Sequence, residues 1–173
     1  MSRRLLLGVT GSSAADEVPA LVAEASDLGW TVRIVATDTA LRFMPTVPVQ
    51  VFTNADWQDR QQPLHLQLLD ESDEFLIAPA TANTLAATAH GTAGTLLTAL
   101  VLSRRPAHFW PTMNTRMWNS PAVQRNVHQL IQDGHHVLTP DPTVALTSDA
   151  PNTAVGPIPG TALPQLTRCC HRP

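Results

Sequence analysis

The sequence has no lysine and no tyrosine, and only two cysteines in 173 residues. Cys169 and Cys170 are adjacent near the end of the chain, where neighbouring cysteines rarely bridge, so neither a disulfide framework nor a metal site is expected. The apolar run Leu5–Leu7 is too short for a signal sequence or a membrane span. The formal charge is only −3 and no long basic run occurs, which argues against nucleic acid as a partner. We therefore expect a cytoplasmic protein that contacts neither nucleic acid nor membrane.

Length and hydrophobic pattern indicate a single α/β domain. The chain is 43% hydrophobic and 14% charged, which suits a compact core. Short apolar runs at Arg4–Val9 and Thr31–Ala36 predict strands, and helical spacing over Ala15–Leu28 predicts a helix between them. This alternation predicts a Rossmann-like (flavodoxin-like) parallel sheet with helices on both faces.

The rest of the chain predicts further elements of the same kind. Leu41–Phe43 opens a helix that Pro45 and Pro48 interrupt, and a polar loop follows a strand at Gln50–Phe52. After these we expect a helix at His65–Leu69, a buried strand at Glu74–Ala78, two helical pieces within Thr81–Leu102 separated near Gly91 and Gly94, a strand at Pro106–Trp110, a helix at Pro121–Asp133 and a last strand at His136–Thr139. Residues 1–140 would form the domain, and the proline-rich residues 141–173 a covering segment and flexible tail.

Three loops that follow predicted strands are rich in small hydroxyl, amide and glycine residues. They are residues 8–13 (GVTGSS), 36–39 (ATDT) and 79–84 (PATANT). Such loops meet in the crevice beyond the carboxyl ends of parallel strands, where ligands bind. Hydroxyl groups and backbone N–H groups can hold a phosphate there without a lysine, although an ordinary turn explains the first loop equally well. The loop lacks the Gly-x-Gly-x-x-Gly and Gly-Lys-Ser/Thr patterns, which disfavours nicotinamide cofactors and nucleoside triphosphates.

A fourth segment, residues 111–118 (PTMNTRMW), follows the predicted strand at Pro106–Trp110. It places two methionines and a tryptophan beside Asn114, an amide that can both donate and accept. Core packing explains methionine and tryptophan, but it does not explain their position in a loop between Pro111 and Pro121.

These segments resemble the motifs of the homo-oligomeric flavin-containing cysteine decarboxylases. Residues 79–84 are similar to that family's Pro-Ala-Ser-Ala-Asn-Thr motif, and residues 111–118 to its Pro-x-Met-Asn-x-x-Met-Trp motif. Pro63-Leu64-His65 resembles the segment that carries its active-site histidine. The resemblance extends over roughly residues 3–140. It is strongest to the peptidyl-cysteine decarboxylases of lantibiotic, linaridin and thioamide peptide biosynthesis.

The resemblance implies FMN as the cofactor and a set of site residues. His65 and Asn114 would be catalytic, His65 as the base and Asn114 as the residue that holds the substrate carboxylate, with Met117 and Trp118 beside the substrate. The residues implied to contact the cofactor are Gly8, Thr10, Gly11, Ser12, Ser13, Thr37, Thr39, Phe43, Ala80, Thr81, Ala82, Asn83, Thr84 and Met113.

The implied reaction is the oxidative decarboxylation of a C-terminal cysteine on a ribosomally made peptide. Flavin oxidises the cysteine side chain to a thioaldehyde, which then accepts the charge left by carbon dioxide, and an aminoenethiol results. The resemblance also implies a homo-oligomer, a trimer or dodecamer, with the C-terminal segment of the precursor peptide as its partner, and it allows contact with other peptide-modifying enzymes. The uncharged Thr81–Leu102 stretch and the Met-Trp segment agree with oligomerisation if they expose apolar surface.

Two departures from the family pattern leave alternatives open. The usual Asp-Asn pair is replaced by Gly94-Thr95, which alters a polar contact near the flavin or a subunit interface. Residues 143–149 (TVALTSD) lack the cysteine and the Gly-Arg of phosphopantothenoylcysteine decarboxylases, which favours a peptide substrate. That decarboxylase, a flavin prenyltransferase and a flavin-binding regulatory subunit without activity remain as alternatives.

Overall fold

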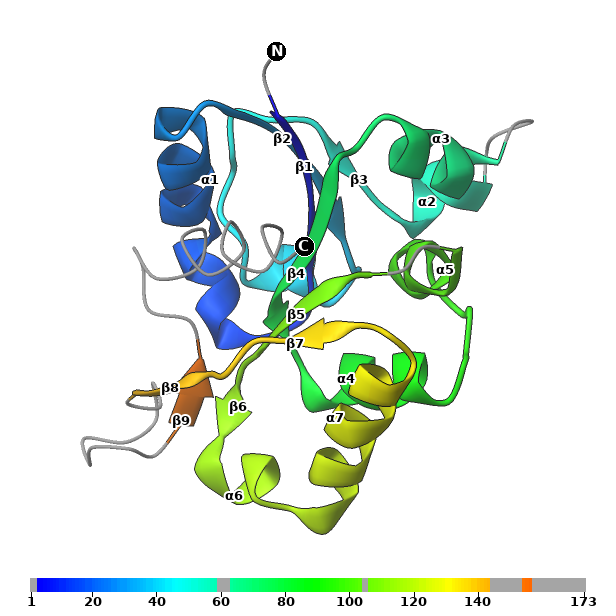
Figure 1. Cartoon of the computed structure of the whole chain (residues 1–173). Helices are drawn as coiled ribbons and strands as arrows, with labels where there is room; N and C mark the ends of the chain where they lie inside the picture. The colour runs from blue at the N-terminus through cyan, green and yellow to red at the C-terminus, as the bar shows by residue number, and fades with distance from the viewer. Residues whose placement is uncertain (1–2, 59–62, 104–105, 144–153, 157–173) are drawn as a thin grey trace.

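The computed structural model describes residues 3–58, 63–103, 106–143 and 154–156, and a six-stranded parallel sheet lies at its centre (Figure 1). In spatial order the strands are β3 (Val51–Phe52), β2 (Trp30–Ala36), β1 (Arg3–Val9), β4 (Glu74–Ala80), β5 (His108–Pro111) and β7 (His136–Val137). This is a Rossmann-like strand order, so the predicted fold class is confirmed. The order reverses between β1 and β4, so a ligand crevice is expected beyond the ends of these two strands.

Helices cover both faces of the sheet, as predicted. The short helix η1 (Ser13–Glu17) and α1 (Val18–Asp27) pack on one face. The other face carries α3 (Leu64–Asp70), α4 (Ala82–Ala89), α5 (Leu96–Ser103) and α7 (Pro121–Gln132). Leu5 and Leu7 point into the first layer and Leu6 into the second, because side chains alternate along a strand.

The short apolar helix α5 is buried between α3, α4 and the sheet. Leu96, Leu97, Leu100 and Val101 are at most 1% exposed. The expectation that the uncharged Thr81–Leu102 stretch exposes apolar surface is therefore wrong for its second half, where Leu102 is the exception at 44% exposed. The lack of charge in this stretch reflects core packing.

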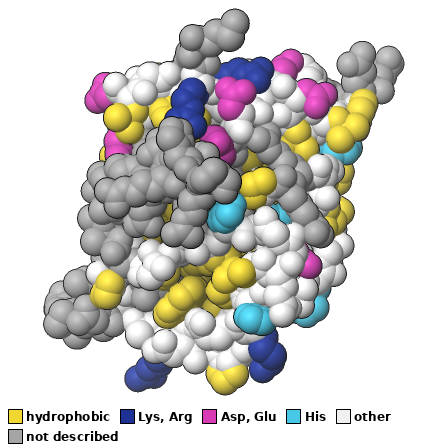
Figure 2. Space-filling view, in the orientation of Figure 1, with side chains coloured by type: hydrophobic (Ala, Val, Ile, Leu, Met, Phe, Trp, Pro, Cys, Tyr) yellow, Lys and Arg dark blue, Asp and Glu magenta, His cyan; other side chains and the backbone are white. Residues whose placement is uncertain are grey.

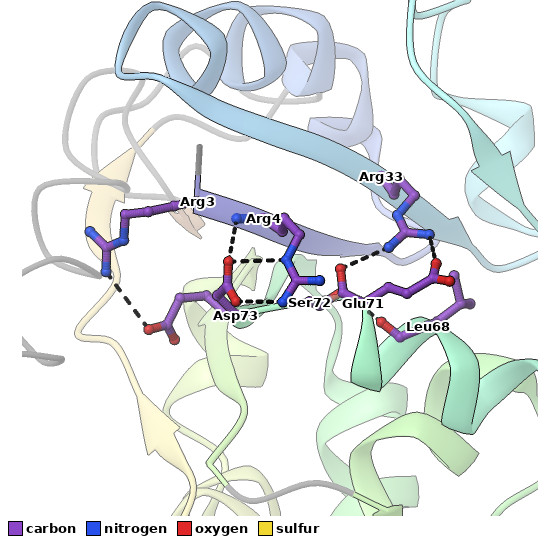
Figure 3. A network of polar contacts seen from close by, with 8 residues as sticks. Arg3, Arg4, Arg33, Leu68, Glu71, Ser72 and Asp73 are labelled. Carbon is purple, nitrogen blue, oxygen red and sulfur yellow. Dashed lines mark hydrogen bonds and ion pairs between the residues drawn. The ribbon is translucent and has the colours of Figure 1, made fainter. Parts of the chain in front are cut away.

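Charged side chains gather at the end of the sheet opposite the expected crevice (Figure 2). Arg4 on β1 binds the carboxylate of Asp73 through its backbone N–H and its guanidinium, at 2.7 to 3.3 Å (Figure 3). Arg33 on β2 binds both the side chain and the backbone carbonyl of Glu71, and the pairing holds the pKa of Glu71 below its usual value. Exposed ion pairs contribute little stability. Their effect is to attach the end of α3 and the turn before β4 to the sheet.

Several element boundaries differ from those expected from the sequence. The helix expected over Ala15–Leu28 is divided into η1 and α1, because Pro19 in the first turn of α1 has no N–H to continue a helix from η1. The helix expected at Leu41–Phe43 is a single 3-10 turn, η2 (Ala40–Arg42). The expectation of a polar loop after Phe52 is wrong, because this segment contains the helix α2 (Asn54–Gln58). The carboxylate of Asp56 stabilises its first turn by accepting hydrogen bonds from the N–H and the hydroxyl of Thr53.

A second, three-stranded sheet was not expected. It consists of β6 (Met113–Asn114), β9 (Ala154–Gly156) and β8 (Asp141–Thr143), paired antiparallel in that order. The expectation that the strand at His136–Thr139 is the last one is therefore wrong. Residues 111–118 are also not a plain loop, because β6 is followed by the single helical turn α6 (Thr115–Trp118). Of the covering segment and flexible tail expected over residues 141–173, only residues 141–143 and 154–156 are described, and the rest of this expectation lies outside the described residues.

No helix in the described part of the chain is long and apolar enough to cross a membrane. Among the same residues, no group of three or more histidine, cysteine, aspartate or glutamate side chains is placed to hold a metal ion.

Candidate active site

A cleft with a volume of about 540 Å³ lies beyond the carboxyl ends of β1, β2, β4 and β5. All four predicted segments contribute to it, from the loops after β1 and β2, the start of α4 and the stretch after β5. The described residues that line it are Thr10, Gly11, Ser12, Thr37, Asp38, Thr39, Asn54, Thr81, Ala82, Asn83, Thr84, Thr95, Thr112, Met113 and Met117. Eleven of them were predicted as site residues, and the structure brings these eleven together in one cleft.

Thr10 joins the first and third loops at the floor of the cleft. Its hydroxyl donates to the carbonyl of Pro79 at 2.7 Å and accepts from the N–H of Thr81 at 3.0 Å. Thr81 in turn caps α4 by accepting from the N–H of Thr84. The hydroxyl of Thr10 is therefore occupied in holding the two loops together, which was not foreseen when it was predicted as a cofactor ligand.

We expect Thr10→Val to lower the free energy of unfolding by about 2–3 kcal/mol, because two buried backbone groups lose their partner while the side-chain shape is kept. Urea unfolding measures this change, and Thr10→Ser, which retains the hydroxyl, is the matched control. Equal midpoints for the valine variant and the wild type would contradict this role.

Gly11 brings the first and second loops into contact. A Cβ atom at this position would lie 2.5 Å from Cγ2 and 2.6 Å from Cβ of Thr39, closer than real Cβ contacts allow. The hydroxyl of Thr37 accepts from the N–H of Ala40 at 3.2 Å and so holds the second loop in its turn. Only glycine allows the two loops to approach in this way.

A Gly11→Ala substitution is expected to weaken binding of the flavin that the sequence resemblance implies roughly tenfold, because overpacking of this kind typically costs about 1–3 kcal/mol and displaces Thr39. Titration with flavin, followed by its fluorescence, measures the loss. Adding Thr39→Gly removes both overlapping atoms and should restore much of the affinity. If the double variant binds no better than Gly11→Ala, the steric explanation is wrong.

Asn114 caps the helical turn α6. Its Oδ1 accepts from the N–H of Met117 at 2.8 Å, which fixes the orientation of the amide. The Nδ2 group has no partner among the described residues and the side chain is exposed, so two N–H donors face outward. This arrangement suits recognition of a carboxylate, which only accepts.

His65 is not part of the wall of the cleft. It lies in the first turn of α3, with its ring edge-on to Trp57 at a centroid distance of 6.2 Å. Its Nδ1 is buried without a hydrogen-bond partner in the described part of the chain. The next residue of the helix, Leu66, is 45% exposed.

The Flavoprotein family matches residues 1–159 of this chain. The chain belongs to the Flavoprotein family. A probable phosphopantothenoylcysteine decarboxylase of Streptococcus mutans is 34% identical over 165 residues, covering 90% of this chain and 92% of the relative. The mersacidin decarboxylase of a Bacillus species is 32% identical over 143 residues, covering 80% and 74%. A crystal structure of SpaF, described as an FMN-dependent cysteine decarboxylase, is 38% identical with a TM-score of 0.72, covering 80% and 85%.

These similarities place this flavoprotein among the cysteine decarboxylases and support FMN as its cofactor. The residues of the cleft fit that cofactor. Its walls carry neutral hydroxyl and amide groups and the two apolar methionines, and its volume lies within the range of small-molecule sites. Backbone N–H groups at the start of η1 and α4 add the donors that a phosphate or a ring carbonyl needs.

Six residues predicted to contact the cofactor or substrate of this flavoprotein do not line the cleft, and Asn114, described above, is one of them. Gly8 lies within β1, where Leu97 and Ile77 leave no room for a side chain, so its visible role is in packing. Phe43 is 45% exposed at the end of η2. The other three are Ser13, Ala80 and Trp118.

Four residues that line the flavoprotein cleft were not predicted from the sequence: Asp38, Asn54, Thr95 and Thr112. Asp38 and Thr112 lie inside the predicted site segments 36–39 and 111–118, so a prediction that included every residue of these segments would have contained them. No feature of the sequence predicted Asn54 as a site residue, because the segment that forms its helix was expected to be a loop.

Thr95 occupies one of the positions where the family's Asp-Asn pair is missing. It lines the cleft, and its hydroxyl accepts from the N–H of Thr98 while the Thr98 hydroxyl accepts from the N–H of Thr95. This reciprocal cap supplies hydrogen-bond acceptors to backbone N–H groups at the start of α5 without an acidic residue.

Proposed function

We propose that this flavoprotein binds FMN in the cleft and oxidatively decarboxylates the C-terminal cysteine of a ribosomally made peptide. The observation that carries the peptide assignment is the chemistry of the cleft. None of the described residues that line it is basic, so they offer no cation to a phosphorylated substrate. The sequence also has no cysteine before Cys169, so residues 141–168 supply no thiol to reduce the product further.

We assign binding of the substrate carboxylate to Asn114. Its Nδ2 group donates two hydrogen bonds, while the bond from Met117 holds the amide in place. An uncharged donor binds the carboxylate without the strong ion pair that would stabilise it against loss of carbon dioxide. The nearby Met117, 44% exposed, provides an apolar contact for the rest of the peptide.

We assign removal of the substrate thiol proton to His65, because a histidine is a suitable base near neutral pH. His65 does not reach the cleft of its own chain, so we propose that it serves the cleft of a neighbouring copy. The exposed Leu66 and Phe43 supply apolar surface for such a contact. The active form is then a homo-oligomer, either a trimer or a dodecamer made of four trimers.

Bound FMN supplies a two-electron acceptor for the hydride that leaves Cβ of the cysteine. The protein's own part is to bind, orient and deprotonate. The floor built by Thr10 and Thr81 supports the cofactor, and Asn114 and His65 position the reacting terminus.

A model peptide ending in cysteine tests the proposal. Incubation with the protein should remove the mass of carbon dioxide plus two hydrogen atoms, measured by mass spectrometry. A peptide amidated at its C-terminus is the matched control and should stay unchanged, because it has no carboxylate to lose. An unchanged free-acid peptide, with flavin bound, would reject the function.

The second candidate is phosphopantothenoylcysteine decarboxylation. The Streptococcus mutans relative favours it, since the similarity extends over nearly the whole of both chains. Phosphopantothenoylcysteine in the same assay distinguishes the two: its turnover, with the peptide untouched, would select this second function.

A further inference from the structure

Asp38 is the only ionisable side chain among the described residues that line the cleft. It follows β2, next to Thr39, which packs against Gly11 of the first loop. FMN has one anionic part, the phosphate, and neutral parts that offer hydrogen-bond donors, the hydroxyl groups of its ribityl chain and the ring N3–H. A carboxylate repels the former and accepts hydrogen bonds from the latter.

Asn54 fixes the orientation of this carboxylate. The N–H of Leu96, at the start of α5, can only donate, and it lies 2.9 Å from Oδ1 of Asn54. The Nδ2 of Asn54 must therefore point the other way, where it donates to Oδ2 of Asp38 at 3.3 Å. Oδ1 of Asp38 has no partner among the described residues, and the side chain is exposed.

The Asn54 amide thus connects two walls of the cleft, one 16 residues before it in the sequence and the other 42 residues after it. It joins the loop after β2 to the first turn of α5, where the family's Asp-Asn pair is missing. Asn54 and the reciprocal cap of Thr95 and Thr98 together satisfy that turn.

We propose that Asp38 binds the ribityl hydroxyl groups of FMN through Oδ1, and that Asn54 is the positioning residue that holds its carboxylate for this contact. The inference rests on the proposed flavin site and goes beyond it by assigning the one charged group of the cleft. It needs no contact with the phosphate.

Three flavins separate the two parts of the cofactor: FMN, riboflavin, which lacks the phosphate, and lumiflavin, which lacks the ribityl chain as well. For Asp38→Ala we expect the dissociation constants of FMN and riboflavin to rise by about tenfold each, and that of lumiflavin to stay the same. Asp38→Asn, which keeps an acceptor oxygen, should show a smaller rise. Fluorescence titration of the apoprotein measures all three.

A contact between Asp38 and the phosphate would change the dissociation constants differently. If Asp38 faced the phosphate, removing its charge would tighten FMN and leave riboflavin unchanged. That result, or unchanged dissociation constants for FMN and riboflavin, would overturn the assignment.

Asn54→Asp tests the positioning role. It keeps the acceptor for Leu96 but replaces the donor to Asp38 with a second carboxylate, so FMN binding should weaken by about tenfold in the wild-type background and not at all in the Asp38→Ala background. Additive effects in the two backgrounds would show that Asn54 does not act through Asp38. Gln58→Ala, an exposed change on the same helix, is the control and should leave FMN binding unchanged.

Flavin binding and the melting temperature of the apoprotein are measured without turnover, so this test is independent of the decarboxylase assay. Melting temperatures equal to that of the wild type show that a binding defect is not a folding defect. A wild-type protein that binds flavin but turns over no substrate rejects the proposed function and leaves the Asp38 assignment standing. A wild-type protein that binds no flavin overturns both.

Discussion

Replacement of His65 by asparagine should leave the protein yellow with bound flavin and reduce turnover by roughly 10²–10⁴-fold, the range typical of a lost general base. The reason for retained binding is its position: His65 lies on α3 and contributes nothing to the described wall of the cleft. The cofactor therefore keeps all of its contacts within the chain, and only removal of the thiol proton is lost. Flavin absorbance and peptide mass spectrometry on the same sample measure the two quantities.

Two comparisons protect this prediction from a trivial explanation. The Nδ1–H of the exposed His90 donates to the carbonyl of Ala86, so His90→Asn is the matched substitution and should keep full turnover. Mixing His65→Asn with Asn114→Asp protomers tests whether the two residues act from different copies, because mixed oligomers would contain some intact sites. Unchanged turnover in His65→Asn would reject the assignment of this residue as base.

Asn114→Asp should lower kcat/KM by roughly 10³-fold while the fold is kept. The carboxylate of aspartate still accepts from the N–H of Met117, so the cap of α6 survives. The two outward donors, however, become a negative charge that faces the substrate carboxylate, and like charges placed together cost several kcal/mol. Steady-state kinetics with a cysteine-terminated peptide measures the loss.

Asn114→Ser is the informative companion variant. Serine is also a good cap, but it offers a single donor and no charge, so its loss of kcat/KM should lie between those of the wild type and the aspartate variant. Equal melting temperatures for all three proteins would show that the cap is preserved. An aspartate variant as active as the wild type would place the carboxylate site elsewhere.

Most of the main sheet was predictable because its signals are local. The buried run Leu5–Leu7 and the β-branched run in β2 read as strands on sequence alone, and Gly91 and Gly94 correctly divided α4 from α5. The loops that follow strands had to meet at one edge of a parallel sheet, which is why most of the cleft was identified.

The errors have one physical origin, which is dependence on distant partners. α2 has five residues and too little periodicity to predict; it is stabilised by Asp56 at its start and by the contact from Asn54 to Leu96. The strands β6 and β9 have two and three residues, and only pairing with distant segments makes them strands, β6 with β9 and β9 also with β8. The role of α5 was misread because absence of charge is equally typical of a core helix and of an interface.

The site shows the same division. The motifs predicted Thr81 and Asn114 as site residues, and of these two Thr81 lines the cleft, because the direction of a side chain is not in a motif. Thr10 was predicted to contact the cofactor, and it lines the cleft while its hydroxyl bonds Pro79 and Thr81. Asn54 joined the site only when the chain folded it against Asp38.

For this protein, the sequence alone determined the α/β class, the position of the cleft and membership of a flavin-using family, because hydrophobic period and loop chemistry are properties of short segments. Tertiary structure alone decided which hydroxyl groups hold loops together at the cleft, where His65 lies relative to the cleft, and how Asp38 is oriented. These depend on hydrogen bonds between segments many residues apart, and such partners exist only after the chain has packed.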